Sequence, residues 1–547
     1  MLPSPGTLLG LDNSQFSRWY PGQQEVFKSI MDWSYSDARF LGIAAPTGSG
    51  KTILALLTAT LTGKRTCVLT STKGLQEQYM TDTFVLGGVN VKGQNNFRCT
   101  LVPECTAEEG PCHEGLSCLY RNNDGCPYRA QLSRALDANI VVTNYAYYLA
   151  QTCFSSGLGD FDLIICDEAH SAFSALEKNL SVYLSRMDVE SLGVSFPSLP
   201  TSEATLVSKG KKKKVPDGIS APELWSQWAQ WAECCTPIVD ERVHQLDRDI
   251  RYLRDDGKPV PQALSKSYRT AKGTLAKLES LASSTGDWII QRTLRGNYLF
   301  TPRWVADRGD RLFQSTPKVM LMSAILSAKT MDTLGVVEGA DRDLVEVGSY
   351  FPPENTPIWH IPTTRVNYRS DDFSATIWQA RIDQIIQRRM GRKGIIFTVS
   401  YDRAKLLLSR SRYKDIMLTH STGDVSLVVN RFKAMKPPAI LVSPTVTTGW
   451  DFPGLDYIIV GKVPYPDTKD LVLQARHLDD NDWSSYLAMD TLVQECGRGS
   501  RASTDKCEVL CVDDNFVWFW GKYKHFAPKW FQERVRGSLT CVPDPPV

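Results

Sequence analysis

The stretch that decides the fold covers residues 40–52 and reads FLGIAAPTGSGKT. Its first part, residues 40–45, is short and mostly apolar, which predicts a buried parallel strand. A turn rich in glycine, residues 46–50, separates this strand from the apolar run 53–60, which predicts a helix. A strand, a glycine-rich turn and a helix that begins with Lys-Thr are typical of a loop that binds phosphates.

The loop also predicts how a nucleoside triphosphate is held. Glycines let the backbone approach the phosphates, and the unpaired N–H groups at the helix N-terminus attract them. The Lys51 ammonium group would reach the β- and γ-phosphates, and the Thr52 hydroxyl would bind Mg²⁺. The first motif position is Ala45 in place of glycine, and its side chain is still small. The residues expected to bind ATP here are Thr47, Gly48, Ser49, Gly50, Lys51 and Thr52.

Length and composition indicate several domains and no membrane span. The chain has 547 residues, enough for several domains that each bury a core. Charged residues make up 22%, the net charge is +2, and no apolar run approaches the ~18 residues of a membrane helix. Residues 1–6 lack the basic and apolar regions of a secretory signal, so we expect a cytoplasmic protein. A net charge near zero does not exclude a nucleic-acid ligand, because acidic surface elsewhere can offset a basic groove.

A glutamine upstream of the loop is a candidate for reading the nucleotide base. Residues 16–24 read FSRWYPGQQ and precede an amphipathic stretch, residues 25–33. A glutamine amide both donates and accepts hydrogen bonds, so Gln23 is able to pair with adenine. A solvent-exposed glutamine at the start of a helix is the alternative.

Two adjacent carboxylates end a later apolar strand, residues 161–170, which reads FDLIICDEAH. Asp167 would hold Mg²⁺, and Glu168 would orient or deprotonate the attacking water, as ATP hydrolysis requires. Strands predicted at residues 65–72 and 140–144 belong to the same open α/β sheet. A phosphate loop followed by DEAH about 115 residues later resembles the superfamily 2 helicases.

Five of the fourteen cysteines lie between residues 99 and 126, in a segment rich in Gly, Pro, Glu and Asn. Four thiolates are what a [4Fe–4S] cluster requires. The order of the cysteines, the CPY sequence at 126–128 and the strand that follows resemble the iron–sulfur helicases of the XPD/DinG type. The ligands that this resemblance implies are Cys99, Cys112, Cys118 and Cys126, with Cys105 as the alternative to Cys112.

A structural zinc site is the rival interpretation of these cysteines. Four-cysteine zinc sites usually pair their ligands as C-x2-4-C, and no such pair occurs in this segment. Buried thiols without a ligand are less expected, because the segment has no apolar run to bury them. Disulfides are not expected either, since the chain shows no export signal.

The strand pattern stops after DEAH and gives way to an insertion. Residues 221–283 have a helical pattern, with Trp225, Trp228 and Trp231 at three-residue spacing, which predicts a helix–helix core and not a base-stacking surface. An all-helical insertion at this place matches the Arch domain of the family. The basic run at residues 209–214 would be a solvated loop or a phosphate contact.

The sheet is expected to resume at residues 297–302 and 318–326. The second segment ends in Ser-Ala-Ile-Leu, where the family usually has Ser-Ala-Thr-Leu. Ile325 therefore removes a hydroxyl from the motif to which the family's coupling role is usually given.

A second α/β unit is expected from residue 336, and its motifs also follow the family. Residues 447–454 read TTGWDFPG and depart from the family at Thr448, where an acidic residue is common. Residues 494–501 read QECGRGSR and match Q-x-x-G-R-x-x-R, which sets two arginines one helical turn apart. Two guanidinium groups from a separate domain suit stabilisation of the γ-phosphate. The residues of this unit expected at the nucleotide are Asp451, Gln494, Arg498 and Arg501.

The predicted fold class is α/β, with two RecA-like parallel-sheet motor domains, an iron–sulfur insertion and a helical Arch-like insertion. The aromatic stretch 516–526 is expected to pack into a core more than to stack on bases. The predicted boundaries are 1–90, 127–172 and 290–335 for motor domain 1, 91–126 for the iron–sulfur domain, 173–289 for the Arch-like insertion and 336–547 for motor domain 2.

The resemblance covers about residues 16–535 and implies an ATP-dependent DNA helicase that moves 5′→3′ on single strands. It implies ATP, Mg²⁺ and a [4Fe–4S] cluster as cofactors, and single-stranded and forked DNA as partners, in repair or replication. Only about 20 residues precede Gln23, so no nuclease domain is expected there. We expect a monomer that binds no membrane and that associates with the nucleoid if the source is bacterial or a phage.

Two other functions fit the same motifs. One is an RNA or RNA–DNA hybrid helicase, because a preference for the 2′-hydroxyl leaves no trace in these motifs. The other is a nucleic-acid-binding protein that ATP switches between conformations without unwinding. Glu168, Arg498 and Arg501 argue against this second alternative, because they are the residues that hydrolysis needs.

Overall fold

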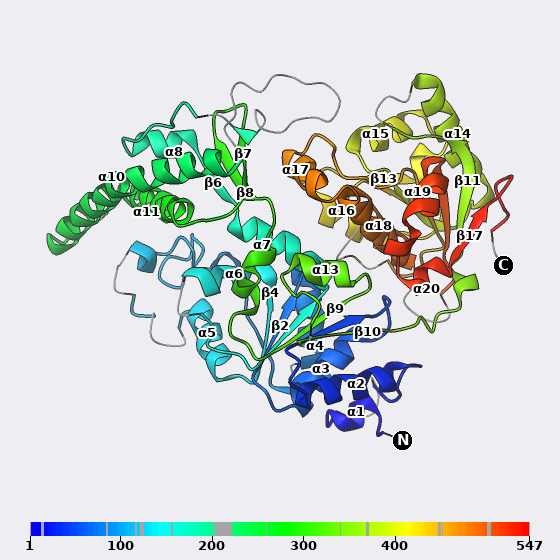
Figure 1. Cartoon of the computed structure of the whole chain (residues 1–547), viewed down its shortest axis with the longest axis horizontal. Helices are drawn as coiled ribbons and strands as arrows, with labels where there is room; N and C mark the ends of the chain where they lie inside the picture. Colours follow the sequence, from blue (N-terminus) through cyan, green and yellow to red (C-terminus); the bar gives the residue numbers. More distant parts are fainter. Residues whose placement is uncertain are drawn as a thin grey trace.

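The computed structural model contains two parallel sheets and a smaller antiparallel sheet (Figure 1). It describes residues 2–11, 16–83, 86–114, 118–120, 125–154, 157–199, 201–202, 221–258, 260–339, 341–367, 371–446, 450, 452–499 and 505–545. The predicted α/β class with two motor sheets is confirmed. No helix of the described residues is long and apolar enough to cross a membrane.

The first sheet has seven parallel strands in the order β10-β1-β9-β5-β2-β4-β3. Its strands are apolar on both faces because helices cover both. Val68 enters one core, for example, while Cys67 and Leu69 enter the other. The strands are β1 (Phe40–Ala44), β2 (Thr66–Thr70), β3 (Val89–Asn90), β4 (Ile140–Asn144), β5 (Leu163–Asp167), β9 (Lys318–Ser323) and β10 (Arg342–Glu346). The helices are α1 (Pro5–Leu8), α2 (Gln23–Tyr35), α3 (Lys51–Leu61), α4 (Lys73–Thr83), α5 (Pro127–Asp137), α6 (Tyr145–Phe154), α7 (Ala172–Leu180), α12 (Asp310–Phe313) and α13 (Ala328–Thr333).

The second sheet also has seven parallel strands, in the order β13-β14-β12-β15-β16-β11-β17. Its central strands are fully buried, and their side chains alternate between two cores. The strands are β11 (Ile358–Thr364), β12 (Lys393–Phe397), β13 (Met417–Thr419), β14 (Ala439–Ser443), β15 (Tyr457–Val460), β16 (Glu508–Asp513) and β17 (Val535–Ser538). The helices are α14 (Asp372–Arg388), α15 (Tyr401–Arg410), α16 (Val425–Ala434), α17 (Leu471–Asp479), α18 (Trp483–Cys496), α19 (Asn515–Tyr523) and α20 (Lys529–Gln532).

The first motor sheet extends further along the chain than the sequence indicates. Strand β10 pairs in parallel with β1, although residues after 336 were expected in the second unit. The second sheet begins only at β11, so the connection between the sheets is residues 347–357. A half-buried edge strand such as β10 has a weak apolar pattern. For this reason the sequence does not predict that β10 belongs to the first sheet.

The Arch-like insertion contains a sheet as well as helices. Helices α8 (Arg186–Ser191), α10 (Ala221–Asp255) and α11 (Gln262–Ala282) pack against the antiparallel strands β6 (Val182–Leu184), β7 (Trp288–Arg292) and β8 (Tyr298–Pro302). The expectation of an all-helical insertion is therefore wrong, and so is the expectation that residues 297–302 resume the motor sheet. Strand β8 pairs instead with β6 and β7, a choice that its own residues do not encode.

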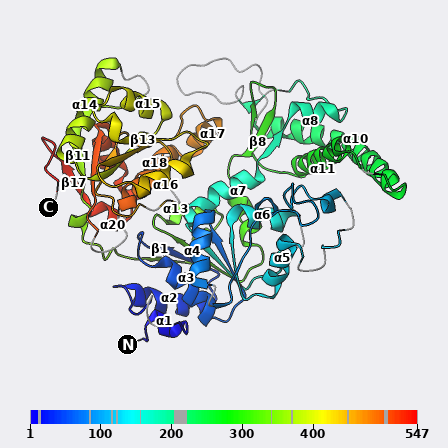
Figure 2. The same cartoon turned by 180° about the vertical axis from the view of Figure 1, so that it is seen from behind.

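The tryptophans of the insertion lie in a core, as predicted, but they pack against strands and not only against a helix, since Trp228 contacts Tyr298 and Phe300 of β8. Trp225 and Trp228 are buried, and Trp225 stacks on Trp288 of β7 with ring centroids 4.7 Å apart. Seen from behind, the α10–α11 pair extends away from the motor sheets (Figure 2). The aromatic stretch at α19 also packs mainly inward, since Phe516, Phe519 and Tyr523 are buried while Trp518 is exposed. The basic run 209–214 lies outside the described residues.

Candidate active site

The phosphate loop joins β1 to α3 with two glycines in the left-handed region. Gly48 has φ +79° and Gly50 has φ +77°, a conformation that L side chains rarely adopt. A Cβ atom at Gly50 would meet Gln23 Nε2, so a side chain there would displace the Gln23 amide and strain the backbone. The loop then presents the start of α3, at Lys51, to the cleft.

Lys51 is buried and its ammonium group points into the loop. Its Nζ atom donates hydrogen bonds to the Ala45 and Pro46 carbonyl oxygens, both at 3.2 Å. These weak partners are neutral, so the charge of Lys51 remains available to phosphate oxygens that enter the loop.

Gln23 connects α2 to the phosphate loop. Its Nε2 atom donates to the carbonyl oxygens of Ser49 and Gly50, both at 3.3 Å, and its Oε1 accepts from the Tyr20 N–H at 3.1 Å. The side chain is therefore bound to the loop itself. Its predicted contact with the base stays a prediction, and its role in fixing the loop is the one that the hydrogen bonds support.

The acid pair stands at the carboxyl end of β5, beside the loop. Asp167 accepts hydrogen bonds from the Tyr79 hydroxyl at 3.1 Å and from the Glu168 N–H at 3.0 Å. Glu168 has φ +51°, an uncommon value for a residue with a side chain, which turns its carboxylate into the cleft. Strain of this kind is often found at functional sites.

Burial and neighbouring charges shift the pKa values of the two carboxylates in opposite directions. Burial raises the pKa of Asp167 to about 6, and the negative charge of Glu168 adds to the rise. Burial alone would raise the pKa of Glu168 as well, but the positive charges of Lys51 and Arg498 lower it. Glu168 therefore stays ionised more readily than Asp167 does, and the ionised carboxylate is the form that accepts a hydrogen bond from water.

His170 links the acid pair to the end of β9. Its Nδ1 atom lies 2.7 Å from the Ser323 hydroxyl and 3.4 Å from Glu168 Oε2. Its Nε2 atom is buried and has no hydrogen-bond partner among the described residues. The Ser323 hydroxyl thus connects His170 to the Ser-Ala-Ile-Leu segment, residues 323–326, and it also accepts from the Ile325 N–H at 3.3 Å. This connection needs no hydroxyl on the side chain of residue 325.

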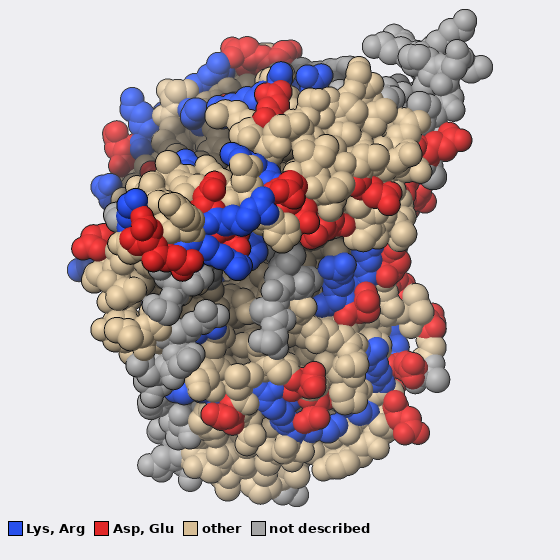
Figure 3. Space-filling model, turned by 90° about the vertical axis from the view of Figure 1, so that its left-hand side faces the viewer, with Lys and Arg blue, Asp and Glu red and all other residues tan. Residues whose placement is uncertain are grey.

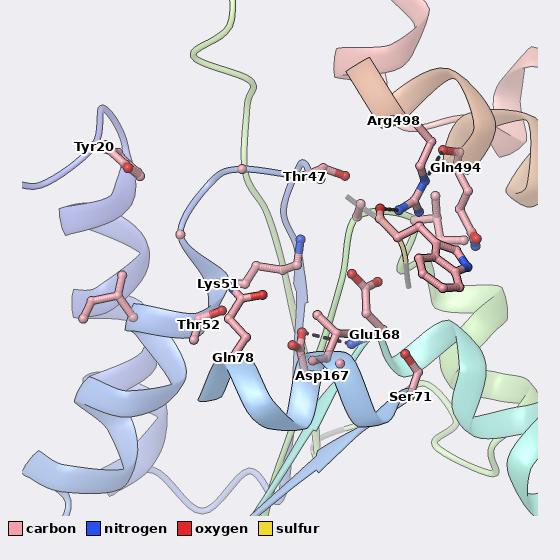
Figure 4. Close-up of a pocket in the computed structure, with 18 of the residues that line it drawn as sticks. Tyr20, Thr47, Lys51, Thr52, Ser71, Gln78, Asp167, Glu168, Gln494 and Arg498 are labelled. Carbon is pink, nitrogen blue, oxygen red and sulfur yellow. Dashed lines mark hydrogen bonds between the residues drawn. The ribbon is translucent and has the colours of Figure 1, made fainter. Parts of the chain in front are cut away.

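Arginine reaches the same cleft from the second motor domain, at the end of α18. Arg498 donates to the Trp450 carbonyl oxygen at 2.9 Å and to the Gln494 carbonyl oxygen at 3.2 Å. Figure 4 shows Gln494 and Arg498 across the space from Lys51 and Glu168. The cleft has a volume of about 1030 Å³. Arg501 and Asp451 lie outside the described residues, so the structure does not place them.

Several residues in the cleft or beside it were not expected from the sequence. Tyr350, in the connection between the sheets, donates to the Gly48 carbonyl oxygen at 2.8 Å and stacks on Tyr20 with ring centroids 5.2 Å apart. Tyr79 is almost fully buried and reaches the acid pair from α4. Lys433 and Trp450 line the side formed by the second domain. A single tyrosine or lysine is not part of a motif with a recognisable spacing. These residues can therefore be assigned to the site only from the folded structure.

The four cysteines expected as cluster ligands line a single pocket. These are Cys99, Cys112, Cys118 and Cys126, and the rest of the lining includes Tyr120, Tyr128 and Arg129. Cys105 is not part of this lining, and its thiol donates to the Val102 carbonyl oxygen at 3.3 Å. Burial raises the pKa of Cys112, and the adjacent Cys118 thiol adds to the rise.

The cysteines surround a space and do not converge on one point. Among the described residues, no three His, Cys, Asp or Glu side chains are grouped so that they would hold a single metal ion. A zinc ion needs its four ligands ~2.3 Å from one centre, whereas an iron–sulfur cluster has several atoms and separates its thiolates. A set of four thiols is one that an iron–sulfur cluster takes and that a zinc ion also takes.

Comparisons with known proteins agree with this geometry. Residues 17–188 match the family model described as "Type III restriction enzyme, res subunit", and residues 384–534 match the model described as "Helicase C-terminal domain". Over 95% of this chain the fold is similar to a solved XPD helicase, with a TM-score of 0.62 and 15% identity over 100% of that structure. The Xpd4 structure from S. tokodaii aligns over 95% of this chain and 100% of that one, with a TM-score of 0.58 and 14% identity.

At 14–15% identity, the likeness to the XPD structures shows a shared fold. A curated relative, the "Probable ATP-dependent helicase" of Methanocaldococcus jannaschii, is 28% identical over 203 residues. That match spans 30% of this chain and 31% of the relative. The site described above is the cleft between the two motor domains.

Proposed function

We propose that this chain is an ATP-dependent DNA helicase of the XPD/DinG type that moves 5′→3′ along single-stranded DNA and separates duplexes with a 5′ tail. The observation that carries the proposal is the composition of the cleft. Lys51 and Glu168 of one motor domain and Arg498 of the other line the same space. Because residues of both domains complete the site, ATP would be hydrolysed only when the two domains close on it. A motor requires this coupling between hydrolysis and domain movement.

Each residue of the cleft has a role in hydrolysis that follows from its position. Lys51 would stabilise charge on the β- and γ-phosphates, and Thr52 and Asp167 would hold Mg²⁺, which neutralises charge on the same phosphates. Glu168 would orient the attacking water and accept its proton. Arg498 would stabilise the γ-phosphate when the domains close and would lose this contact when they open.

The cysteine pocket supports a [4Fe–4S] cluster held by Cys99, Cys112, Cys118 and Cys126. These residues lie in the loops between β3 and α5, away from the nucleotide cleft. A cluster there would tie together a segment that has little regular secondary structure of its own. We propose a structural role for it in the part of the protein that separates the strands.

The charge distribution bears on how the strand is held. On the side of the molecule that carries the tip of α10, Lys and Arg side chains alternate with Asp and Glu side chains (Figure 3). No large field of one sign covers the described part of this face. We therefore expect the strand to be held by local contacts to its phosphates, in agreement with the net charge of +2.

The test is Glu168→Gln, which keeps the size of the side chain but removes the base. The variant should bind ATP and hydrolyse it about 10²–10³ times more slowly, because the water loses its proton acceptor. Glu190→Gln, at an exposed ion pair in the insertion, is the matched control and should hydrolyse ATP normally. Normal turnover in Glu168→Gln would show that another group acts on the water.

Substrate class is tested on the wild-type protein with DNA and RNA tails of one sequence. Strand displacement should occur with the 5′ DNA tail and require ATP. Displacement only with an RNA tail would replace the DNA assignment by the RNA alternative. Hydrolysis stimulated by DNA without displacement of any substrate would support the conformational switch instead.

A further inference from the structure

The pocket formed by the four cysteines has one charged side chain among its described lining residues, and this side chain is a cation. Besides the cysteines, the described lining is apolar, aromatic or hydroxyl-bearing, with the exception of Arg129. None of these lining residues is acidic. The pocket therefore presents one positive charge to four thiols.

The Arg129 guanidinium has no polar partner in the protein. Arg129 is half-buried and is the third residue of α5. Within the part of the chain that the structure describes, it makes no hydrogen bond and no ion pair. Its one ring contact is with Tyr128, whose ring centroid lies 6.0 Å from the guanidinium carbon. The five N–H donors of this side chain are therefore available to a group that enters the pocket.

The charge of Arg129 already acts on the cysteines. Burial raises the pKa of Cys112, the Cys118 thiol adds to the rise, and the positive charge of Arg129 opposes it. Glu109, an acidic residue of the same loops, does not line the pocket. Its carboxylate accepts instead from the N–H and the hydroxyl of Thr106, both at 3.1 Å.

The amino end of α5 adds to the positive potential at the pocket. The helix begins directly after Cys126, which is its N-cap residue and lines the pocket. No side chain caps this end of the helix. The partial positive charge of a helix amino end therefore lies beside the same thiols as Arg129.

An occupied pocket would be anionic whichever metal group it holds. Four thiolates carry more negative charge than a zinc ion or a [4Fe–4S] core offsets. The Cys99 thiol is buried, and the other three thiols are half-buried, so water would compensate this charge only in part. A half-buried anion of this kind is stabilised by a cation beside it.

We propose that Arg129, together with the amino end of α5, is the counter-charge of the metal group held by Cys99, Cys112, Cys118 and Cys126. The inference rests on the proposed cluster and goes beyond it, because it gives a role to a side chain that is no ligand. Arg129 would donate to the cysteine sulfur atoms and stabilise their negative charge. An electron added to a [4Fe–4S] cluster makes it more negative, so Arg129 would also raise its reduction potential.

The first test is how firmly the full-length protein holds its metal. Wild type and Arg129→Gln are purified without oxygen, and iron and zinc are measured before and during exposure to a chelator. Arg129→Gln should lose its metal roughly 10–100 times faster, in line with the effect on affinity of removing an outer partner of a metal site. Arg129→Lys keeps the charge and should lose its metal at close to the wild-type rate.

Arg134→Gln is the matched control for this measurement. Arg134 lies on the same helix, donates to the Ala130 carbonyl oxygen at 3.3 Å and is not among the described lining residues. This variant should hold its metal as the wild type does. Equally fast release from Arg134→Gln and Arg129→Gln would reflect the general loss of basic charge on α5 and would overturn the proposal.

The second test is the reduction potential, which a purely structural role of Arg129 would not shift. Dithionite supplies one electron per cluster, and the visible absorbance follows the reduction. At the wild-type midpoint potential, the ratio of reduced to oxidised cluster should fall about tenfold in Arg129→Gln, which is ~59 mV for one electron. Arg129→Lys should restore the ratio, and melting temperatures show that each variant is folded.

The outcomes separate this inference from the proposed function. Equal metal release in wild type and Arg129→Gln, with equal potentials, overturns the role of Arg129. Wild-type protein that holds metal but neither hydrolyses ATP nor separates strands overturns the proposed function instead. Wild-type protein with neither iron nor zinc overturns both the cluster and its counter-charge. If the metal is zinc, the cluster is wrong and the comparison of metal release decides the role of Arg129 alone.

Discussion

Tyr79 illustrates how single residues outside the motifs support the chemistry. Its hydroxyl donates to Asp167 Oδ2 at 3.1 Å, and it also makes a side-chain hydrogen bond with Thr52. Asp167 and Thr52 are the two residues expected to hold Mg²⁺. Burial, followed by the negative charge of Asp167, raises the pKa of Tyr79, so the hydroxyl stays protonated and keeps donating.

At this scale we predict that Tyr79→Phe weakens Mg²⁺ binding without disrupting the core. The loss of one buried hydrogen bond to a carboxylate is worth about 1–2 kcal/mol, so the Mg²⁺ concentration at half-maximal ATP hydrolysis should rise roughly 5- to 30-fold. A titration of ATPase rate with Mg²⁺, together with binding of a fluorescent nucleotide with and without the ion, measures the change.

Tyr145→Phe is the control for this prediction. The Tyr145 hydroxyl is also buried and bonds to Asp167, but to its backbone carbonyl oxygen, at 2.9 Å. It should lower the melting temperature to a similar degree and leave the Mg²⁺ dependence unchanged. Equal shifts in both variants would mean that the tyrosines act only through stability.

Among the elements, the loops between β3 and α5 are the ones whose structure we expect to depend most on cysteine side chains. They contain short turns and an isolated pairing of Arg98 with Thr106, and the four cysteines line the pocket at their centre. Gly110 lies close to this pocket, since a Cβ atom there would be 3.2 Å from Cys99 Sγ. A segment with so little regular structure would gain order from the proposed cluster, if its thiols held one.

The second prediction separates the two cysteines that the sequence leaves open. Cys112→Ser should lose iron and visible absorbance, because a serine oxygen is a harder and far less acidic ligand than a thiolate. Cys105→Ser should keep both, since Cys105 bonds to Val102 and lies outside the lining of the pocket. Iron content and the spectrum of protein purified without oxygen give the answer. The reverse outcome would assign the ligands to Cys99, Cys105, Cys118 and Cys126.

Helix α17 forms a second element whose role only the structure reveals. Arg476 on this helix is buried, donates to the Arg303 carbonyl oxygen at 2.6 Å and forms an ion pair with Glu177 of α7. Its guanidinium also lies over the rings of Phe173 and Trp304, at 4.8 and 5.4 Å. The second motor domain thereby contacts both the first domain and the base of the Arch-like insertion.

The third prediction is that Arg476→Ala loosens this contact. Removing one partner of a buried, hydrogen-bonded pair costs about 3–5 kcal/mol, so the melting temperature should fall by several degrees. Arg388→Ala removes an exposed pair, worth about 0–1 kcal/mol, and should leave it almost unchanged. A melting temperature of Arg476→Ala equal to that of Arg388→Ala would argue against the contact. Thermal unfolding followed by circular dichroism is the measurement.

For the whole molecule, the two tasks of the proposed helicase fall on different parts of the chain. Lys51 and Glu168 with Arg498 form the nucleotide cleft, whereas the cysteine pocket lies in an insertion to the first motor domain. The motor motifs do not set direction, because both directions use the same loop, acid pair and arginines. The 5′→3′ polarity comes from the resemblance of the cysteine insertion.

The fourth prediction follows from this separation. Cys126→Ser should lose strand separation before it loses ATP hydrolysis, because unwinding demands about 1.4 kcal/mol per base-pair step and hydrolysis needs only the cleft. Strand displacement from 5′-tailed and 3′-tailed duplexes and ATPase should be measured on the same preparation. Robust unwinding from a 3′ tail would falsify the polarity, and equal loss of both activities would place the cluster in the ATPase core.

Local sequence determined the parts of this protein whose chemistry depends on neighbours in the chain. The phosphate loop is one example: its glycines at positive φ, the strand before it and the helix after it follow from residues 40–60 alone. The same is true of DEAH at the end of β5 and of the tryptophan stripe on α10. The apolar periodicity of a helix or strand and the residues that favour a turn depend only on neighbours in the chain. They can therefore be recognised in the sequence without knowing the fold.

The tertiary structure decided everything that depends on which elements meet. Strand β8 looks like a motor strand but pairs with β6 and β7, and β10 joins the first sheet from beyond the expected boundary. Tyr79 reaches Asp167 across 88 positions of sequence. Such contacts arise from packing between distant segments, and no local pattern of residues encodes their partners.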